Sequence, residues 1–117
     1  MTEHPAPGTI PLIPMPPLTP AALRAAVAQI APACLPAFVE HLDQAAEQSA
    51  AQSTVAPLRT FLQWWGEFVA VQRVPARAAR LHELETIADT ASDRAVLDAA
   101  VAEIQDIMAA AHREATA

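Results

Sequence analysis

The fold depends on residues 56–73, which read APLRTFLQWWGEFVAVQR. Large apolar side chains recur in this stretch at spacings of three and four, which is typical of one face of an α-helix. That stripe consists of Leu58, Phe61, Leu62, Trp65, Phe68 and Val69, and it is widened by Trp64 and Val71. A helix that is apolar over most of its circumference is either central or also contacts a partner. We therefore expect a central helix here, or one that leaves part of its face to another molecule.

The adjacent tryptophans Trp64 and Trp65 are the most informative residues of this helix. Neighbouring helical residues point about 100° apart, so the two indoles cannot both occupy the centre of one face. We expect one tryptophan in the core and the other at an edge, where tryptophan is enriched in binding hot spots. Burial of both by surrounding helices is the alternative. The candidate partner-binding residue of this helix is Trp64.

Helical periodicity extends to both sides of this stretch. Thr19-Pro20 predicts the cap and first residue of a helix that ends at Pro32, followed by a helix from near Cys34 to a polar turn at 48–54. The third helix would take Ser53 or Thr54 as its cap. Residues 75–88 and 93–111 predict two further helices, the last capped by Ser92 and carrying a heptad-like repeat. The predicted fold is all-α, a bundle of four or five helices over residues 19–117.

Residues 1–18 form an arm of different composition. Proline fixes φ and removes a backbone donor, so the arm is expected to be extended or disordered. Apolar residues alternate with the prolines, which leaves two interpretations: a strap lying on the helical body, which we favour, or a peptide that docks on another protein. The prolines are Pro5, Pro7, Pro11, Pro14, Pro16 and Pro17, and the apolar residues are Ile10, Leu12, Ile13, Met15 and Leu18.

The composition excludes several classes of function. A net charge of −6 and a pI near 5.0 argue against a nucleic-acid binder, because phosphate contacts dominate that affinity. Cys34 is the single cysteine, so no internal disulfide can form. Neither a secretory signal nor an apolar run long enough to span a membrane is evident, and we expect a cytoplasmic protein. The lack of Lys, Asn and Tyr indicates a high-GC bacterial genome.

The chain also resembles a known family. Residues 56–65, APLRTFLQWW, together with IAP at 30–32 and LPAF at 35–38, are similar to a small helical family of high-GC bacteria, the domain of unknown function 6247. The resemblance covers roughly residues 19–85. Some members resemble the upstream partner in toxin–antitoxin gene pairs, which implies a protein-binding role. Family members often have an acidic residue after Ala-Pro, where this chain has Ala33, and the family has no assigned catalytic residues.

Motifs that would carry catalysis or metal binding are incomplete. His82-Glu83-Leu84-Glu85 lacks the second histidine of a zinc protease motif. Glu40, Asp43 and Glu47 form an acidic stripe that is interpreted as a solvated helix face. We therefore expect no catalytic residues, no metal site and no cofactor.

A stripe of arginines, Arg73, Arg77 and Arg80, recurs at i, i+4 and i+7. It is either solvated or a contact for an oppositely charged partner, including the acidic stripe of a second copy. We assign these arginines, with Trp64, as candidate partner-binding residues. The leading hypothesis is a non-enzymatic protein-interaction module, and its more specific version is an antitoxin-like partner of a toxin. A homodimeric scaffold protein is the alternative, and a small-molecule binder is the least favoured.

Overall fold

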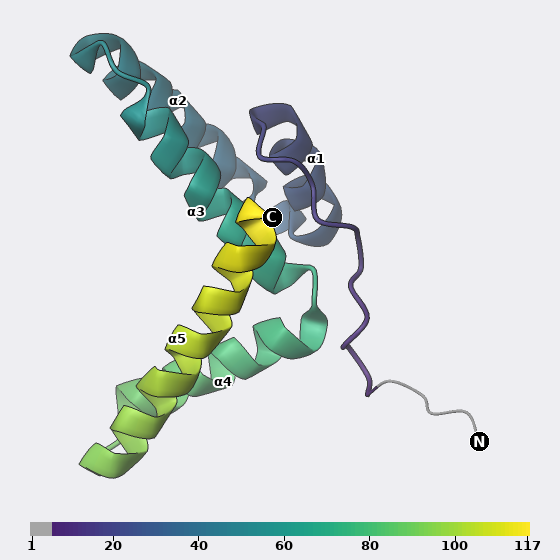
Figure 1. Cartoon of the computed structure of the whole chain (residues 1–117), viewed down its shortest axis with the longest axis vertical. Coiled ribbons are helices and arrows are strands. Elements are labelled where there is room, and N and C mark those ends of the chain that lie inside the picture. Colours follow the sequence, from purple (N-terminus) through teal and green to yellow (C-terminus); the bar gives the residue numbers. More distant parts are fainter. Residues whose placement is uncertain (1–5) are drawn as a thin grey trace.

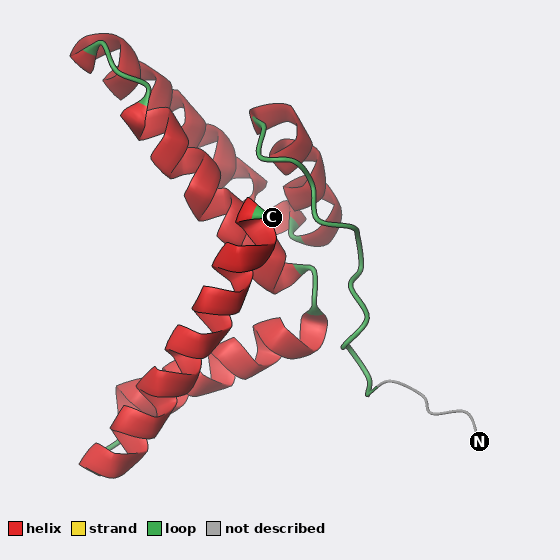
Figure 2. Ribbon diagram, viewed as in Figure 1, coloured by secondary structure: helices red, strands yellow, loops and turns green. Residues whose placement is uncertain are grey.

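A computed structural model describes residues 6–117 and shows an all-α protein (Figures 1 and 2). No strand is present in this part of the chain, and a short 3₁₀ turn, Pro32–Cys34, links the first two helices. The prediction of a helical bundle is confirmed. The five helices are α1 (Pro20–Ile30), α2 (Leu35–Gln52), α3 (Ala56–Gln72), α4 (Pro75–Thr90) and α5 (Arg94–Thr116).

The helices form two antiparallel hairpins, α2–α3 and α4–α5, that diverge like the arms of a V (Figure 1). Helix α1 packs beside the first hairpin, and the C-terminal end of α5 crosses α3 near the vertex. The Cα radius of gyration is 16.4 Å, whereas a compact domain of this length has about 13 Å. The molecule is therefore open, and much helix surface faces solvent.

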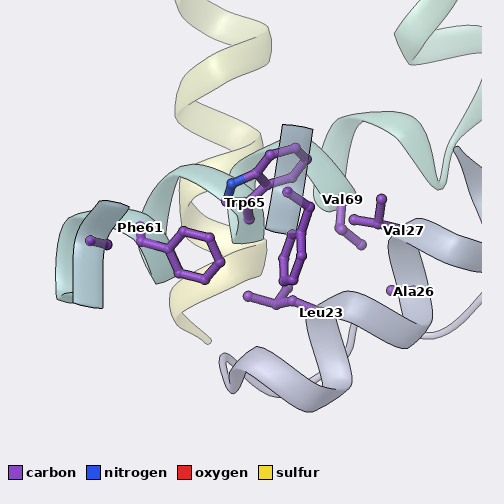
Figure 3. Packing of buried hydrophobic residues seen from close by; sticks show 8 residues of the cluster. Leu23, Ala26, Val27, Phe61, Trp65 and Val69 are labelled. Carbon is purple, nitrogen blue, oxygen red and sulfur yellow. The ribbon is translucent and has the colours of Figure 1, made fainter. Parts of the chain in front are cut away.

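The main core gathers four of the five aromatic residues of the chain around α3, namely Phe38, Phe61, Trp65 and Phe68. Phe38 of α2 makes edge-to-face contacts with Phe61 and Trp65, each at 5.1 Å between ring centroids. Figure 3 shows Val27 of α1 beside Val69 of α3 in this cluster. Aromatic pairs of this geometry contribute about 0.5–1.5 kcal/mol beyond the burial of their area. The few large side chains thus stabilise a chain whose other apolar residues are mostly alanine.

A second, smaller cluster joins the two hairpins. Ala70 and Val71 of α3 are buried against Ala111 of α5, with Leu81 and Met108 packed around them. Small residues at this crossing let α3 and α5 approach closely. Ala70, Val71 and Ala111 thus form the centre of the apolar contact between the two hairpins.

Two predicted helix boundaries are confirmed and four are wrong. Thr19 caps α1 by accepting a hydrogen bond from the Ala22 N–H at 3.2 Å, and α4 begins at Pro75 as predicted. The polar run 48–54 is not a turn, because α2 continues to Gln52 and only Ser53, at φ 52°, adopts the left-handed conformation that ends the helix.

At α5, Asp93 is the cap in place of Ser92, and its carboxylate accepts from the Ala95 N–H at 2.8 Å. The same helix runs to Thr116, beyond the predicted end at Ala111. At α3, the cap position is Val55, not Ser53 or Thr54, although the Thr54 hydroxyl accepts from the Ala56 N–H at 3.2 Å.

The N-terminal arm lies extended along the vertex, as the strap interpretation predicts; residues 1–5 lie outside the described part of the chain. The Leu12 N–H donates to the Arg73 carbonyl at 2.7 Å, and the Ala76 N–H donates to the Gly8 carbonyl at 2.9 Å. Ile13, Met15 and Leu18 pack against the main core. Ile10 and Leu12 are exposed. The arm is therefore attached to the α3–α4 junction by backbone hydrogen bonds and apolar contacts.

Gly66 lies where the arm and α5 both reach α3. A Cβ atom at this position would lie 2.5 Å from Leu18 Cδ2 and 3.4 Å from Ala115 Cβ. Glycine costs about 1 kcal/mol relative to alanine in a helix interior. The close approach of Leu18 gives a physical reason for a glycine in the middle of α3.

In the described part of the chain, every helix is too short or too polar to cross a membrane.

Candidate functional site

The two tryptophans have opposite environments on α3. Trp65 is 3% exposed, and its indole N–H donates to His41 Nδ1 on α2 at 2.9 Å. Trp64 is 52% exposed. The prediction of one core and one edge tryptophan is confirmed, and the hydrogen bond to His41 gives the buried indole its polar partner.

Trp64 stands at a groove where α3, α4 and α5 meet. The groove has a volume of about 380 Å³. Its floor is apolar and comes from three helices, with Trp64, Phe68 and Val71 from α3, Leu81 from α4 and Met108 from α5. Polar side chains, Glu67, Gln72 and Glu85, complete the lining. The groove therefore combines an apolar floor with acidic and amide groups.

Neighbouring rings hold the Trp64 side chain in place. Its ring stacks on Phe68 with centroids 5.8 Å apart and an interplanar angle of 9°. It also makes an edge contact with Trp65 at 4.6 Å. A large aromatic side chain that is already ordered loses little conformational entropy when a partner covers it. Trp64 thus has both the exposure and the rigidity of a binding anchor.

The arginine stripe contacts carboxylates of its own chain. Arg73 and Arg77 both form ion pairs with Glu114 of α5, the second at 2.7 Å. Arg80 makes a two-pronged contact with Glu103, at 2.5 and 2.8 Å, and also pairs with Glu83. These contacts hold α4 and its junction with α3 against α5. Of the four predicted partner-binding residues, only Trp64 lines the groove.

The ion pairs shift the pKa values of three of the groups that form them, Glu114, Glu103 and Arg80. Hydrogen bonds from Arg77 and Arg73 hold the pKa of the Glu114 carboxyl below its ordinary value, although partial burial opposes the shift. The hydrogen bond from Arg80 likewise lowers the pKa of Glu103, and the same contact raises the pKa of Arg80. These carboxylates therefore stay ionised at neutral pH and keep the arginines occupied.

The acidic stripe on α2 is separate from the arginines. Glu40, Asp43 and Glu47 are exposed along an open, shallow surface that also includes Leu35 and Val39. No arginine or histidine of residues 6–117 forms an ion pair with them. The two charged stripes do not meet within one chain.

The described residues contain no arrangement of side chains that suggests a metal site or a reactive thiol. Within 6–117, no three His, Cys, Asp or Glu side chains are grouped closely enough to hold a metal ion. Cys34 is half-buried at the start of α2, against the main core.

Sequence reasoning missed Leu81 and Met108 as groove residues, because their periodicity assigns them only to inward helix faces. The spacing of Trp64, Phe68 and Val71 at i, i+4 and i+7 was the available signal for a second apolar stripe on α3.

Comparisons with known proteins return no relative. No family model, curated protein or solved structure matches the chain. The resemblance to the small helical family of high-GC bacteria stays a prediction.

Proposed function

We propose that this protein is a non-enzymatic protein-interaction module that binds its partner at the groove beside Trp64. The observation that carries the proposal is the combination of 52% exposure and aromatic packing at Trp64. Tryptophan is prominent among the residues that dominate binding energy, particularly beside apolar pockets that exclude water. The open V shape supports the proposal, because it leaves the groove accessible between the hairpins.

The arginines support this function indirectly. Their ion pairs with Glu114 and Glu103 hold α5 against α4 and against the end of α3. The groove floor is contributed by these same three helices. We therefore assign Arg73, Arg77 and Arg80 the role of shaping the groove, and Trp64 the role of contacting the partner.

Co-expression with the product of the neighbouring gene, followed by pull-down, tests the proposal and its antitoxin-like version. We expect Trp64→Ala to weaken capture by about 30-fold or more, since a hot-spot residue contributes about 2 kcal/mol or more. Val55→Ala is the control, because Val55 is also exposed, at 54%, but lies at the far end of the α2–α3 hairpin. Equal capture by both variants would refute the groove, and lack of growth rescue would refute the antitoxin-like role.

A homodimeric scaffold is the second candidate, favoured by two exposed residues on α5. Val96 and Val101 are 46% and 39% exposed. A second copy could cover them by packing α5 against α5. Sedimentation velocity of the wild-type chain and of Val101→Glu distinguishes the cases: a dimer that the substitution dissociates supports the scaffold, and a monomer at high micromolar concentration excludes it.

A further inference from the structure

The groove beside Trp64 has two carboxylates at its rim, Glu67 and Glu85, and neither pairs with an arginine of residues 6–117. Glu85 is exposed and forms no ion pair with any residue of 6–117. Within the same residues, Glu67 has one basic side chain within ion-pair distance, His112 at 3.5 Å, and that contact is an ion pair only when the imidazole is protonated. The nearby arginines are already bound to Glu114, Glu103 and Glu83. A partner that brings positive charge to this rim would therefore meet two carboxylates that no arginine of residues 6–117 neutralises.

The apolar floor has the dimensions of two helical turns. Trp64, Phe68 and Val71 follow one another at i, i+4 and i+7 along α3, a span of about 10 Å at a rise of 1.5 Å per residue. An amphipathic helix that lies in a groove presents anchors at this same spacing. A volume of about 380 Å³ is at the lower end of the range for small-molecule pockets, and it suits a few large side chains.

We infer that the groove receives a basic amphipathic helix of another protein, with an apolar stripe flanked by Arg or Lys that reach Glu67 and Glu85. This inference rests on the proposed function and specifies the class of partner. An added β-strand does not suit the groove, since it is built from helices and residues 6–117 offer no sheet edge. A second copy of the chain is disfavoured, because it would bring a further charge of −6 to an acidic rim.

A display library of helical peptides, with randomised apolar and flanking positions, tests the inference on the full-length folded protein. We expect enrichment of peptides with apolar residues spaced by three and four and with flanking Arg or Lys. Binding of an enriched peptide is then measured by fluorescence anisotropy at low and high salt. Trp64→Ala should weaken it by about 30-fold. Glu67→Gln/Glu85→Gln should weaken it by about tenfold at low salt, with a smaller effect at high salt.

The matched control is Glu40→Gln/Glu47→Gln, which removes the same charge from the exposed face of α2. Circular dichroism confirms that each variant is folded. The basic-helix inference would be overturned if the enriched peptides depend on Trp64 but are acidic or neutral. It would also be overturned if the control variant weakens their binding as much as the rim variant does. In both cases the groove would still be the binding site. Peptides that ignore Trp64 would overturn both proposals. A failure to enrich any peptide would overturn the helix inference alone, because the pull-down tests the proposed function separately.

Discussion

Gly66 and Leu18 offer a quantitative test of how the arm is attached to the body. An alanine methyl group at position 66 would lie 2.5 Å from Leu18 Cδ2, about 1 Å or more inside the optimal carbon–carbon separation of roughly 3.5–4.0 Å. Pro17 and the Thr19 cap restrain the backbone on either side of Leu18, so relief of this contact has to come from rotation of the Leu18 side chain within its packed surroundings. Overpacking of this kind costs about 1–3 kcal/mol, whereas alanine gains about 1 kcal/mol over glycine in helix propensity.

The sign of the Gly66→Ala effect should therefore depend on Leu18. In the wild-type background we expect the substitution to lower the free energy of unfolding by about 1 kcal/mol, the difference between the two effects. In a Leu18→Ala background the collision is absent, and Ala115 at 3.4 Å is an ordinary contact. There Gly66→Ala should raise the free energy of unfolding by up to about 1 kcal/mol.

Urea unfolding followed by circular dichroism measures all four members of this double-mutant cycle. The expected coupling between the two sites is about 2 kcal/mol. Ala102→Gly, at an exposed position of α5, calibrates the propensity difference in the same protein. If Gly66→Ala has the same effect in both backgrounds to within about 0.5 kcal/mol, Leu18 does not pack on Gly66, and the strap described for the arm is refuted.

Three further perturbations test the site and its support. Trp64→Phe should leave the blue-shifted, poorly quenched emission of buried Trp65, and Trp65→Phe should leave red-shifted emission that iodide quenches; similar spectra would contradict the opposite burial of the two residues. His41→Leu removes the acceptor of the Trp65 indole N–H and should cost about 1–3 kcal/mol in urea unfolding, and an unchanged midpoint would refute a stabilising role for this hydrogen bond. Glu114→Gln should destabilise the protein at neutral pH by about 1–3 kcal/mol. Because the folded-state pKa of Glu114 is lowered, its contribution is present above the unfolded-state pKa and is lost as pH falls through the folded-state value. The free energies of unfolding of wild type and Glu114→Gln should therefore converge as the pH is lowered. A difference that stays constant as the pH falls would show that the ionised Glu114 does not stabilise the protein through its ion pairs.

Periodicity predicted the helices and the placement of one tryptophan in the core and the other at an edge, because both depend on local helix geometry. A spacing of three and four places residues on one face, and a step of one residue rotates the side chain by about 100°. These relations hold whatever the rest of the chain does. Errors at the boundaries arose where two signals compete, as at Ser92 and Asp93, which are both good caps. The run 48–52 is polar, yet its alanines and glutamines favour helix, and α2 continues through it.

The partners of the arginines could not be predicted in the same way. The spacing of Arg73, Arg77 and Arg80 shows that they share a face, but not which residues that face meets. Glu114 lies 41 residues after Arg73, and Glu103 lies 23 residues after Arg80. The contacts exist only because α5 folds back along α4 and crosses α3. The groove has the same origin, since its floor needs three helices at a particular angle.

Arg73 connects the parts of the molecule on which the groove depends. Its carbonyl accepts from Leu12 of the arm at 2.7 Å, its guanidinium donates to the Ile13 carbonyl at 3.3 Å, and it also pairs with Glu114 of α5. It stands at the junction of α3 and α4, where the direction of the chain changes between the two arms of the V. The arm and α5 are therefore fastened to the same point of the bend. Charge-assisted hydrogen bonds are directional, so these polar contacts restrain the bend in addition to the apolar packing of α3 on α5. The residues that shape the binding surface are thus distinct from the residues that form it, and the arginine stripe belongs to the first group.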